Sequence, residues 1–302
     1  MAILKAVIIV LVLLGIGRAV SKGWAELAAF RFQWTIQNVL WIAMGGFVYA
    51  ISLLPLGFYW HRILNRMGQR PTFFNTIRAY YLGHLGKYVP GKAMVVVLRT
   101  GALKDSNRAV TAISVFAETL SMMAVGAFQA AAIIAVQFSS HTTLLAASIG
   151  LMLVAGVPTF PPVFRFIVLT LKVDKVDEAV NSAIEAYRWP LVIRGWLLSF
   201  VAWNVMMLSL WCVLNALEPE TVSLIAEYPR LLASVTLAVV AGFLSLLPGG
   251  VGVRELVFNS LLSGTYSPAV ALVCPVLLRL AWLFAELVTA GVLHAIGRSK
   301  SI

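Results

Sequence analysis

The fold of this chain is decided where a long apolar region is interrupted by Gly86-Lys87-Tyr88-Val89-Pro90-Gly91-Lys92, with Arg99 shortly after. A second interruption reads Leu247-Pro248-Gly249-Gly250-Val251-Gly252-Val253-Arg254-Glu255. Charged side chains are costly inside a bilayer, and a Pro-Gly pair breaks a helix. Two broken, charged segments between long apolar helices are typical of a membrane transporter.

The composition predicts a membrane protein. Hydrophobic residues make up 61% of the 302 positions and charged residues only 12%, whereas soluble domains carry roughly 25% charged residues. Several apolar runs reach the roughly 20 residues that a membrane-spanning helix needs. We therefore expect an all-α polytopic membrane protein. Its net charge of +11 fits cytoplasmic loops beside anionic lipid headgroups better than it fits nucleic-acid binding.

About six transmembrane helices are predicted from the apolar runs. They cover residues 3–17, 35–59, 110–138, 143–164, 191–217 and 268–296. The first run is taken as an uncleaved helix, with a cleaved signal peptide as the alternative. The charged, amphipathic stretch 165–190 is predicted to be a cytoplasmic linker.

The broken segments 72–103 and 231–262 are predicted to be re-entrant helical hairpins. If both are re-entrant and both termini are cytoplasmic, every loop follows the positive-inside rule. Span, hairpin and span then occur twice, over about 36–138 and about 195–297. Such an inverted repeat places a site near the membrane midplane, and the alternative is a coincidence between two kinked hairpins. We expect one integral domain over 1–302 in the inner or plasma membrane.

Four cations are candidates for binding a lipid phosphate: Lys87, Lys92, Arg99 and Arg254. A half-helix that begins after a break offers free amides to an anion, and a guanidinium can pair with phosphate in a bidentate manner. In the alternative, the two lysines extend to the headgroups of the inner leaflet, and the arginine at 254 only holds the fold.

Four further charged residues are candidates for balancing these cations or for carrying protons: Glu118, Glu255, Arg279 and Glu286. An ionisable residue inside a membrane helix indicates a functional site by default. The alternative is a buried, purely structural network of ion pairs. The residues predicted to break the helices are Pro90, Gly91, Pro248, Gly249, Gly250 and Gly252.

Other kinds of site find little support in the sequence. Residues 86–92 match the GxxxxGK spacing of a nucleotide-binding loop, but Ala93 follows where Ser or Thr is required, and no strand precedes them. The four histidines lack the spacing of metal ligands. Both cysteines lie in apolar runs, where they are small packing residues. We expect no metal, no cofactor and no soluble-type active site, so an enzyme is the less favoured reading.

The two interruptions, in this order and about 158 residues apart, resemble the transmembrane, flippase-like region of lysylphosphatidylglycerol synthases over nearly the whole chain. The resemblance implies a lipid-handling domain with two re-entrant hairpins. It also implies that a lipid cavity is lined by Lys87, Pro90, Gly91, Arg99, Pro248, Gly249, Gly250, Arg254 and Glu255. The full synthases carry a cytosolic aminoacyl-transferase domain that this sequence lacks, so we do not expect it to make a lysyl-lipid by itself.

The first hypothesis is therefore a flippase-like transporter that moves or presents an anionic phospholipid or glycolipid. Because no ATP-binding motif is found, transport would be downhill or linked to protons. The alternatives are a membrane-embedded transferase acting on a lipid-linked substrate, with Glu118 or Glu255 as its base, and a non-catalytic subunit that presents lipid. The expected partners are membrane lipids and no nucleic acid. Two protein partners are alternatives: a lipid-synthesis enzyme, and a second copy of the chain in a homo-oligomer.

Overall fold

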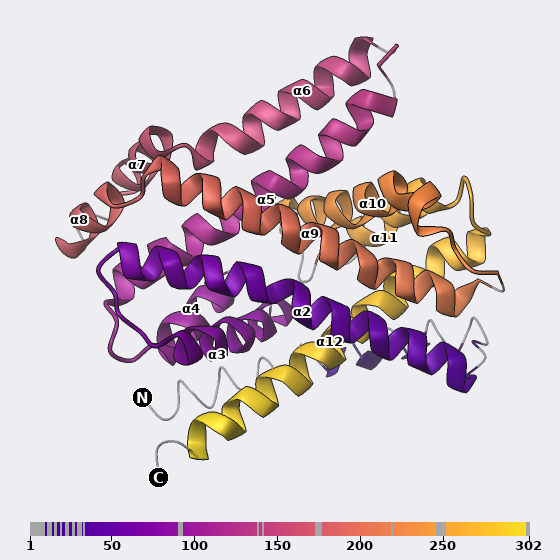
Figure 1. Cartoon of the computed structure of the whole chain (residues 1–302), viewed down its shortest axis with the longest axis horizontal. Coiled ribbons are helices and arrows are strands. Elements are labelled where there is room, and N and C mark those ends of the chain that lie inside the picture. Colours follow the sequence, from indigo (N-terminus) through magenta and orange to yellow (C-terminus); the bar gives the residue numbers. More distant parts are fainter. Residues whose placement is uncertain are drawn as a thin grey trace. The chain divides into compact units, whose positions relative to one another are not determined.

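The computed structural model describes residues 34–89, 93–137, 139–140, 142–172, 177–218, 220–245, 250 and 252–299, with positions 10, 14, 17, 18, 20, 21, 24, 25, 28 and 32 before them. Within these residues every regular element is a helix (Figure 1), as the sequence predicts. Some predicted features lie outside the described residues: most of the first apolar run, Pro90, Gly91, Lys92, Pro248 and Gly249.

Five helices in the described part of the chain are long and apolar enough to cross a membrane. They are α2 (Ile36–Arg66), α5 (Arg108–Gln137), α9 (Trp189–Leu217), α10 (Leu224–Leu244) and α12 (Pro268–Ser299). A sixth crossing results if the bent pair of α6 (Thr142–Gly156) and α7 (Pro161–Thr170) is counted as one span. The protein is therefore a multi-pass membrane protein.

The predicted span 143–164 is not one straight helix. Helix α6 is followed by a short 3-10 turn, η2 (Val157–Thr159), and then by α7, with a bend of 71° between the two helical segments. The cause lies in Pro158, Pro161 and Pro162, which cannot donate backbone hydrogen bonds and which favour the start of a new helix. Helix α6 alone, at 15 residues, extends only about 22 Å.

The two broken segments differ in helix length. In the first, α3 (Phe73–His84) and α4 (Ala93–Ala102) have 12 and 10 residues, so they extend about 18 Å and 15 Å, and neither crosses a hydrocarbon core of about 30 Å. In the second, α10 begins earlier than predicted and has 21 residues, which is long enough to cross alone. Helix α11 (Val253–Leu262) has 10 residues. The inverted repeat therefore stays a prediction.

The chain forms two compact units, each assembled from separate stretches of sequence. Unit 1 comprises Met1–Ile51, Tyr81–Val95 and Val205–Ile302, and unit 2 comprises Ser52–Tyr80 and Val96–Asn204. The single integral domain over 1–302 stays a prediction.

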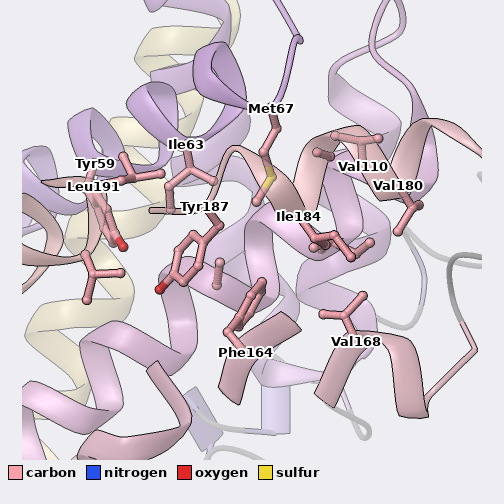
Figure 2. Packing of buried hydrophobic residues seen from close by; sticks show 14 residues of the cluster. Tyr59, Ile63, Met67, Val110, Phe164, Val168, Val180, Ile184, Tyr187 and Leu191 are labelled. Atoms are coloured by element: carbon pink, nitrogen blue, oxygen red, sulfur yellow. The ribbon is translucent and has the colours of Figure 1, made fainter. Parts of the chain in front are cut away.

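In unit 2, helices α5 and α6 run side by side (Figure 1). The predicted linker 165–190 contains α8 (Ala179–Glu185), whose apolar face is buried while Glu185 stays exposed. Figure 2 shows this face in a common core with the end of α2, the start of α5 and helix α7. The linker is therefore amphipathic, as predicted, and its helix packs on the body of the unit.

Hydrogen bonds made by Asn107 join three loops at one end of unit 2. The backbone N–H of Asn107 donates to Gln69 Oε1 at 2.7 Å, and its side-chain Nδ2 donates to Asp177 Oδ2 at 2.6 Å. Asn107 also caps α5, because its Oδ1 accepts from the N–H of Val110 at 3.0 Å. The loops after α2, before α5 and before α8 therefore lie together. The chain leaves this place at α3 and returns to it after α4.

In unit 1, α11 lies beside both α10 and α12 (Figure 1). Helix α11 begins after Gly252, whose φ of 86° favours glycine, and the Gly252 N–H donates to Glu255 Oε2 at 2.7 Å. Burial and the neighbouring Glu227 carboxylate raise the pKa of Tyr266. Since Glu227 lies in the first turn of α10 and Tyr266 follows α11, the start of α10 and the chain after α11 lie close together.

Candidate functional site

A buried carboxylate, Glu286 of α12, is the centre of a polar cluster in unit 1. Its Oε1 accepts hydrogen bonds from Lys87 Nζ at 2.5 Å and from the Tyr49 hydroxyl. Its Oε2 accepts from the Tyr88 hydroxyl at 3.0 Å. We call Tyr49, Lys87, Tyr88, Trp282 and Glu286 the Glu286 cluster. Lys87 and Tyr88 belong to η1 (Leu85–Tyr88), the last described turn before the first break.

Aromatic rings surround the ammonium group of Lys87. Its Nζ lies 5.4 Å from the ring centre of Tyr49, 5.2 Å from that of Tyr88 and 6.0 Å from that of Trp282, distances at which rings attract a cation. Tyr49 and Trp282 stack with centroids 4.4 Å apart. The Lys87 side chain is 24% exposed, whereas that of Glu286 is 0% exposed. The ion pair is therefore accessible from the lysine side only.

A second ion pair of unit 1 joins α11 to α12. Arg279 donates to Glu255 Oε1, and the other oxygen of Glu255 caps α11, as described above. Both side chains are about one-fifth exposed (21% and 19%). Arg254 and Arg279 interact electrostatically with Lys87 and with each other, so these charges belong to one region of the unit.

Arg254 differs from the other cations because no described carboxylate lies within 4.0 Å of its guanidinium group. Its Nε is buried and has no hydrogen-bond partner among the described residues. The side chain lies against Gly242 and Gly250, where an added Cβ would come within 2.6 Å and 2.9 Å of that Nε. Only glycine leaves room for the arginine at these two positions.

Unit 2 holds a separate buried ion pair, formed by Arg99 of α4 and Glu118 of α5. Arg99 Nη1 donates to Glu118 Oε2 at 2.7 Å, and the Tyr80 hydroxyl donates to Oε1 at 2.9 Å. The guanidinium group lies 4.0 Å from the ring centre of Tyr80 and 5.1 Å from that of Trp60. With the two charged side chains 2% and 1% exposed, this pair is closed to solvent.

Ser114 and Ser121 lie on the same face of α5 as Glu118, but both form hydrogen bonds with other residues. Ser114 accepts from Trp60 Nε1 at 2.9 Å, and Ser121 lies 3.2 Å from the Tyr59 hydroxyl. These contacts hold α2 to α5, and both serines serve packing within unit 2.

The structure thus divides the predicted charged residues between the two units. Unit 1 contains Lys87, Arg254, Glu255, Arg279 and Glu286, while Arg99 and Glu118 form the closed pair of unit 2. The predicted phosphate-binding residue Lys92 lies outside the described residues. Sequence reasoning missed the tyrosines. A tyrosine in the middle of an apolar helix, such as Tyr49 of α2, is a usable signal, because a buried hydroxyl needs a partner.

Comparison with protein-family models adds an independent finding. Residues 2–289 match the family described as the lysylphosphatidylglycerol synthase TM region. No curated protein matches the chain. The matched range includes both broken segments and every charged residue of the two sites. The chain therefore belongs to the lysylphosphatidylglycerol synthase TM-region family, which indicates a lipid-related function in a membrane.

Proposed function

We propose that this protein is a flippase-like transporter that moves or presents an anionic phospholipid or glycolipid in the inner or plasma membrane, with both termini cytoplasmic. The observation that carries the proposal is Arg254, a cation of a broken membrane segment that has no described carboxylate within 4.0 Å. A cation at membrane depth that lacks a directly paired carboxylate is costly, so we expect its partner to come from a ligand.

The local charge balance supports an anionic ligand. In this region of unit 1 three cations, Lys87, Arg254 and Arg279, face two carboxylates, Glu255 and Glu286, which leaves one positive charge in excess among the described residues. A guanidinium group binds phosphate through two parallel hydrogen bonds. Lipid phosphate is the anion that a membrane supplies, and family membership favours a lipid.

The flanking loops support two re-entrant hairpins. Asn107 bonds to Gln69 across the base of the first hairpin, and Tyr266 lies near Glu227 at the base of the second. Irregular backbone is tolerated at membrane depth where it is buried or lines a wet cavity. We propose that the two breaks, with Lys92, Pro90, Gly91, Pro248 and Gly249, line such a cavity. We assign the closed Arg99–Glu118 pair to holding α4 on α5.

Lipid movement in reconstituted vesicles tests the proposal. We expect the full chain to speed the transbilayer movement of fluorescent phosphatidylglycerol, measured by dithionite quenching, above that of protein-free vesicles. Arg254→Ala should abolish most of this increase. The control is Arg165→Ala, because Arg165 is an exposed cation whose side chain is 51% accessible and which pairs with Glu185 on the surface of unit 2. It should behave like the wild type.

Two outcomes would contradict the proposal. If the wild type moves neither anionic nor zwitterionic lipids faster than empty vesicles, with or without a proton gradient, the transporter hypothesis fails. If Arg165→Ala loses as much activity as Arg254→Ala, the assignment of Arg254 fails. In the first case a lipid-presenting subunit, or a transferase that yields a labelled lipid product, would take its place.

A further inference from the structure

We propose that anion binding at Lys87 is coupled to proton uptake by Glu286. An incoming phosphate draws the Lys87 ammonium group away, and the buried carboxylate left behind takes a proton from the solvent. One anion and one proton are then bound together, and no covalent bond is formed or broken apart from the O–H bond of Glu286. This inference rests on the proposed function, because it requires an anionic ligand in this region of unit 1.

The accessibility of the two partners favours the exchange. The Lys87 side chain is 24% exposed and that of Glu286 is 0% exposed, so an anion can approach the lysine while the carboxylate stays covered. Arg254 and Arg279 interact electrostatically with Lys87, and both attract an anion to the same place. Lys87 lies on a single turn of 3-10 helix beside the break, where short 3-10 segments often form a connection between longer helices.

The surroundings of Glu286 make an unpaired carboxylate unfavourable. Among the described residues, two basic side chains lie within 4.0 Å of Glu286. Lys87 is one of them, and the other, His84, is charged only when it is protonated. The hydroxyls of Tyr49 and Tyr88 are neutral donors that remain in place but cannot cancel its charge. A buried carboxylate that loses its cation is strongly disfavoured, and binding a proton removes the charge.

The other ionisable groups facing Glu286 come from three elements. Helix α3 contributes His84, whose Nδ1 lies 3.9 Å from Oε1, and Tyr81, whose hydroxyl donates to the Ala50 carbonyl at 2.6 Å. Helices α11 and α12 contribute the arginines at 254 and 279 and the carboxylate at 255, which already caps α11 and pairs with Arg279. His84 is the competing site for the proton, so the experiment must separate it from Glu286.

The closed pair of unit 2 shows why the same role is not assigned to Glu118. Its cation, Arg99, is 2% exposed, so an anion from outside cannot reach it. Both carboxylates have a tyrosine donor and a basic partner. Of the two basic partners, only Lys87 is exposed enough to leave its carboxylate and bind a ligand instead.

Calorimetric titration of the full chain in neutral detergent tests the coupling. Dihexanoylphosphatidylglycerol is the probe, and two buffers of different ionisation enthalpy report the protons taken up. We expect about one proton per bound probe, and an affinity that rises about tenfold per unit fall in pH where the complex holds the proton and the free protein does not. Dihexanoylphosphatidylcholine is the probe without net charge and should show no proton uptake.

Three variants give the idea its sharpest test. Glu286→Gln mimics the protonated carboxylate and frees Lys87, so it should bind the probe more tightly than the wild type at neutral pH, without proton uptake. A misfolded protein cannot bind more tightly. Lys87→Gln should bind more weakly and also without proton uptake. Glu185→Gln, at an exposed pair of unit 2, should match the wild type.

The outcomes separate this inference from the proposed function. If the wild type binds the probe without taking up a proton, the coupling is wrong and the anion site stands. If His84→Gln abolishes proton uptake while Glu286→Gln retains it, the assignment to Glu286 is wrong. If the wild type binds no anionic probe at any pH, the proposed function fails and the coupling fails with it.

Discussion

The two buried carboxylates among the described residues, Glu118 and Glu286, each accept hydrogen bonds from at least one tyrosine hydroxyl and from one basic side chain. Glu286 has Tyr49, Tyr88 and Lys87, and Glu118 has Tyr80 and Arg99. Every one of these partners except Tyr49 comes from the segment 73–102, which contains the first break. The segment is therefore held by charge as well as by packing, and its two ion pairs differ mainly in how far the cation is exposed.

The sequence predicts which residues are charged at membrane depth, but it does not predict their partners. Helix periodicity alone puts Arg279 and Glu286, which are seven residues apart, on one face of a helix. The partner of Glu286 lies 199 residues away in the chain, and helix periodicity carries no information about such contacts. The room for the Arg254 side chain likewise depends on Gly242, a helical glycine that no sequence motif singles out.

Removing one partner of the closed pair should destabilise the protein strongly. Glu118→Gln leaves the Arg99 guanidinium buried without a counter-charge, and breaking a buried ion pair in this way costs about 3–5 kcal/mol. We expect a clear fall in the thermal unfolding midpoint of the full chain in detergent. Glu185→Gln is the control, since an exposed pair contributes about 0–1 kcal/mol. Equal midpoints for both variants would show that the closed pair contributes nothing to stability.

Among the helices, apolar length correctly predicted α2, α5, α9 and α12 as candidate spans. Helix α10 was predicted only as part of a broken segment, and prolines bend the span predicted at 143–164. The sequence pattern also missed the early start of α10, because Glu227, Pro229 and Arg230 look like loop residues. In the structure Ser223 caps α10, because its side chain accepts from the Ala226 N–H, and Arg230 donates to Glu227 at 2.5 Å. Polar residues before an apolar run can therefore belong to the first turns of the helix.

From the hydrogen bond between Asn107 and Asp177, we expect Asp177 to make a pH-dependent contribution to stability. Hydrogen bonds from the Asn107 side chain and from the Ala179 N–H lower the pKa of Asp177. A lowered pKa in the folded state means stabilisation that is present above the unfolded value of about 4 and is lost as the pH falls through the folded pKa. Asp177→Asn should therefore lower the thermal midpoint at pH 6, and the difference from the wild type should shrink below about pH 4.

A suitable comparison for this variant is Asn181→Ala, which changes an exposed side chain of the adjacent helix α8. Its difference from the wild type should not depend on pH. A gap between Asp177→Asn and the wild type that stays constant from pH 6 to pH 3 would contradict the role given to the carboxylate.

The division of the chain into two units could not be predicted from the sequence. Residues 81–95 belong to unit 1, although the residues on either side of them belong to unit 2. This arrangement agrees with long-range contacts such as Lys87 with Glu286 and Arg99 with Glu118. The turn η1 belongs to unit 1, whereas the start of α3 and most of α4 belong to unit 2.

The topology decides whether the two broken segments are equivalent, and two serines test it. Ser106 follows α4 and Ser263 follows α11. If both hairpins are re-entrant, Ser106 is cytoplasmic and Ser263 is external. With the two native cysteines replaced by serine, a membrane-impermeant maleimide should label Ser263→Cys in intact cells and label Ser106→Cys only after permeabilisation. Labelling of Ser263→Cys only after permeabilisation would mean that α10, at 21 residues, crosses the membrane completely. Helix α11, with 10 residues, is too short to cross back, so the inverted repeat would be excluded.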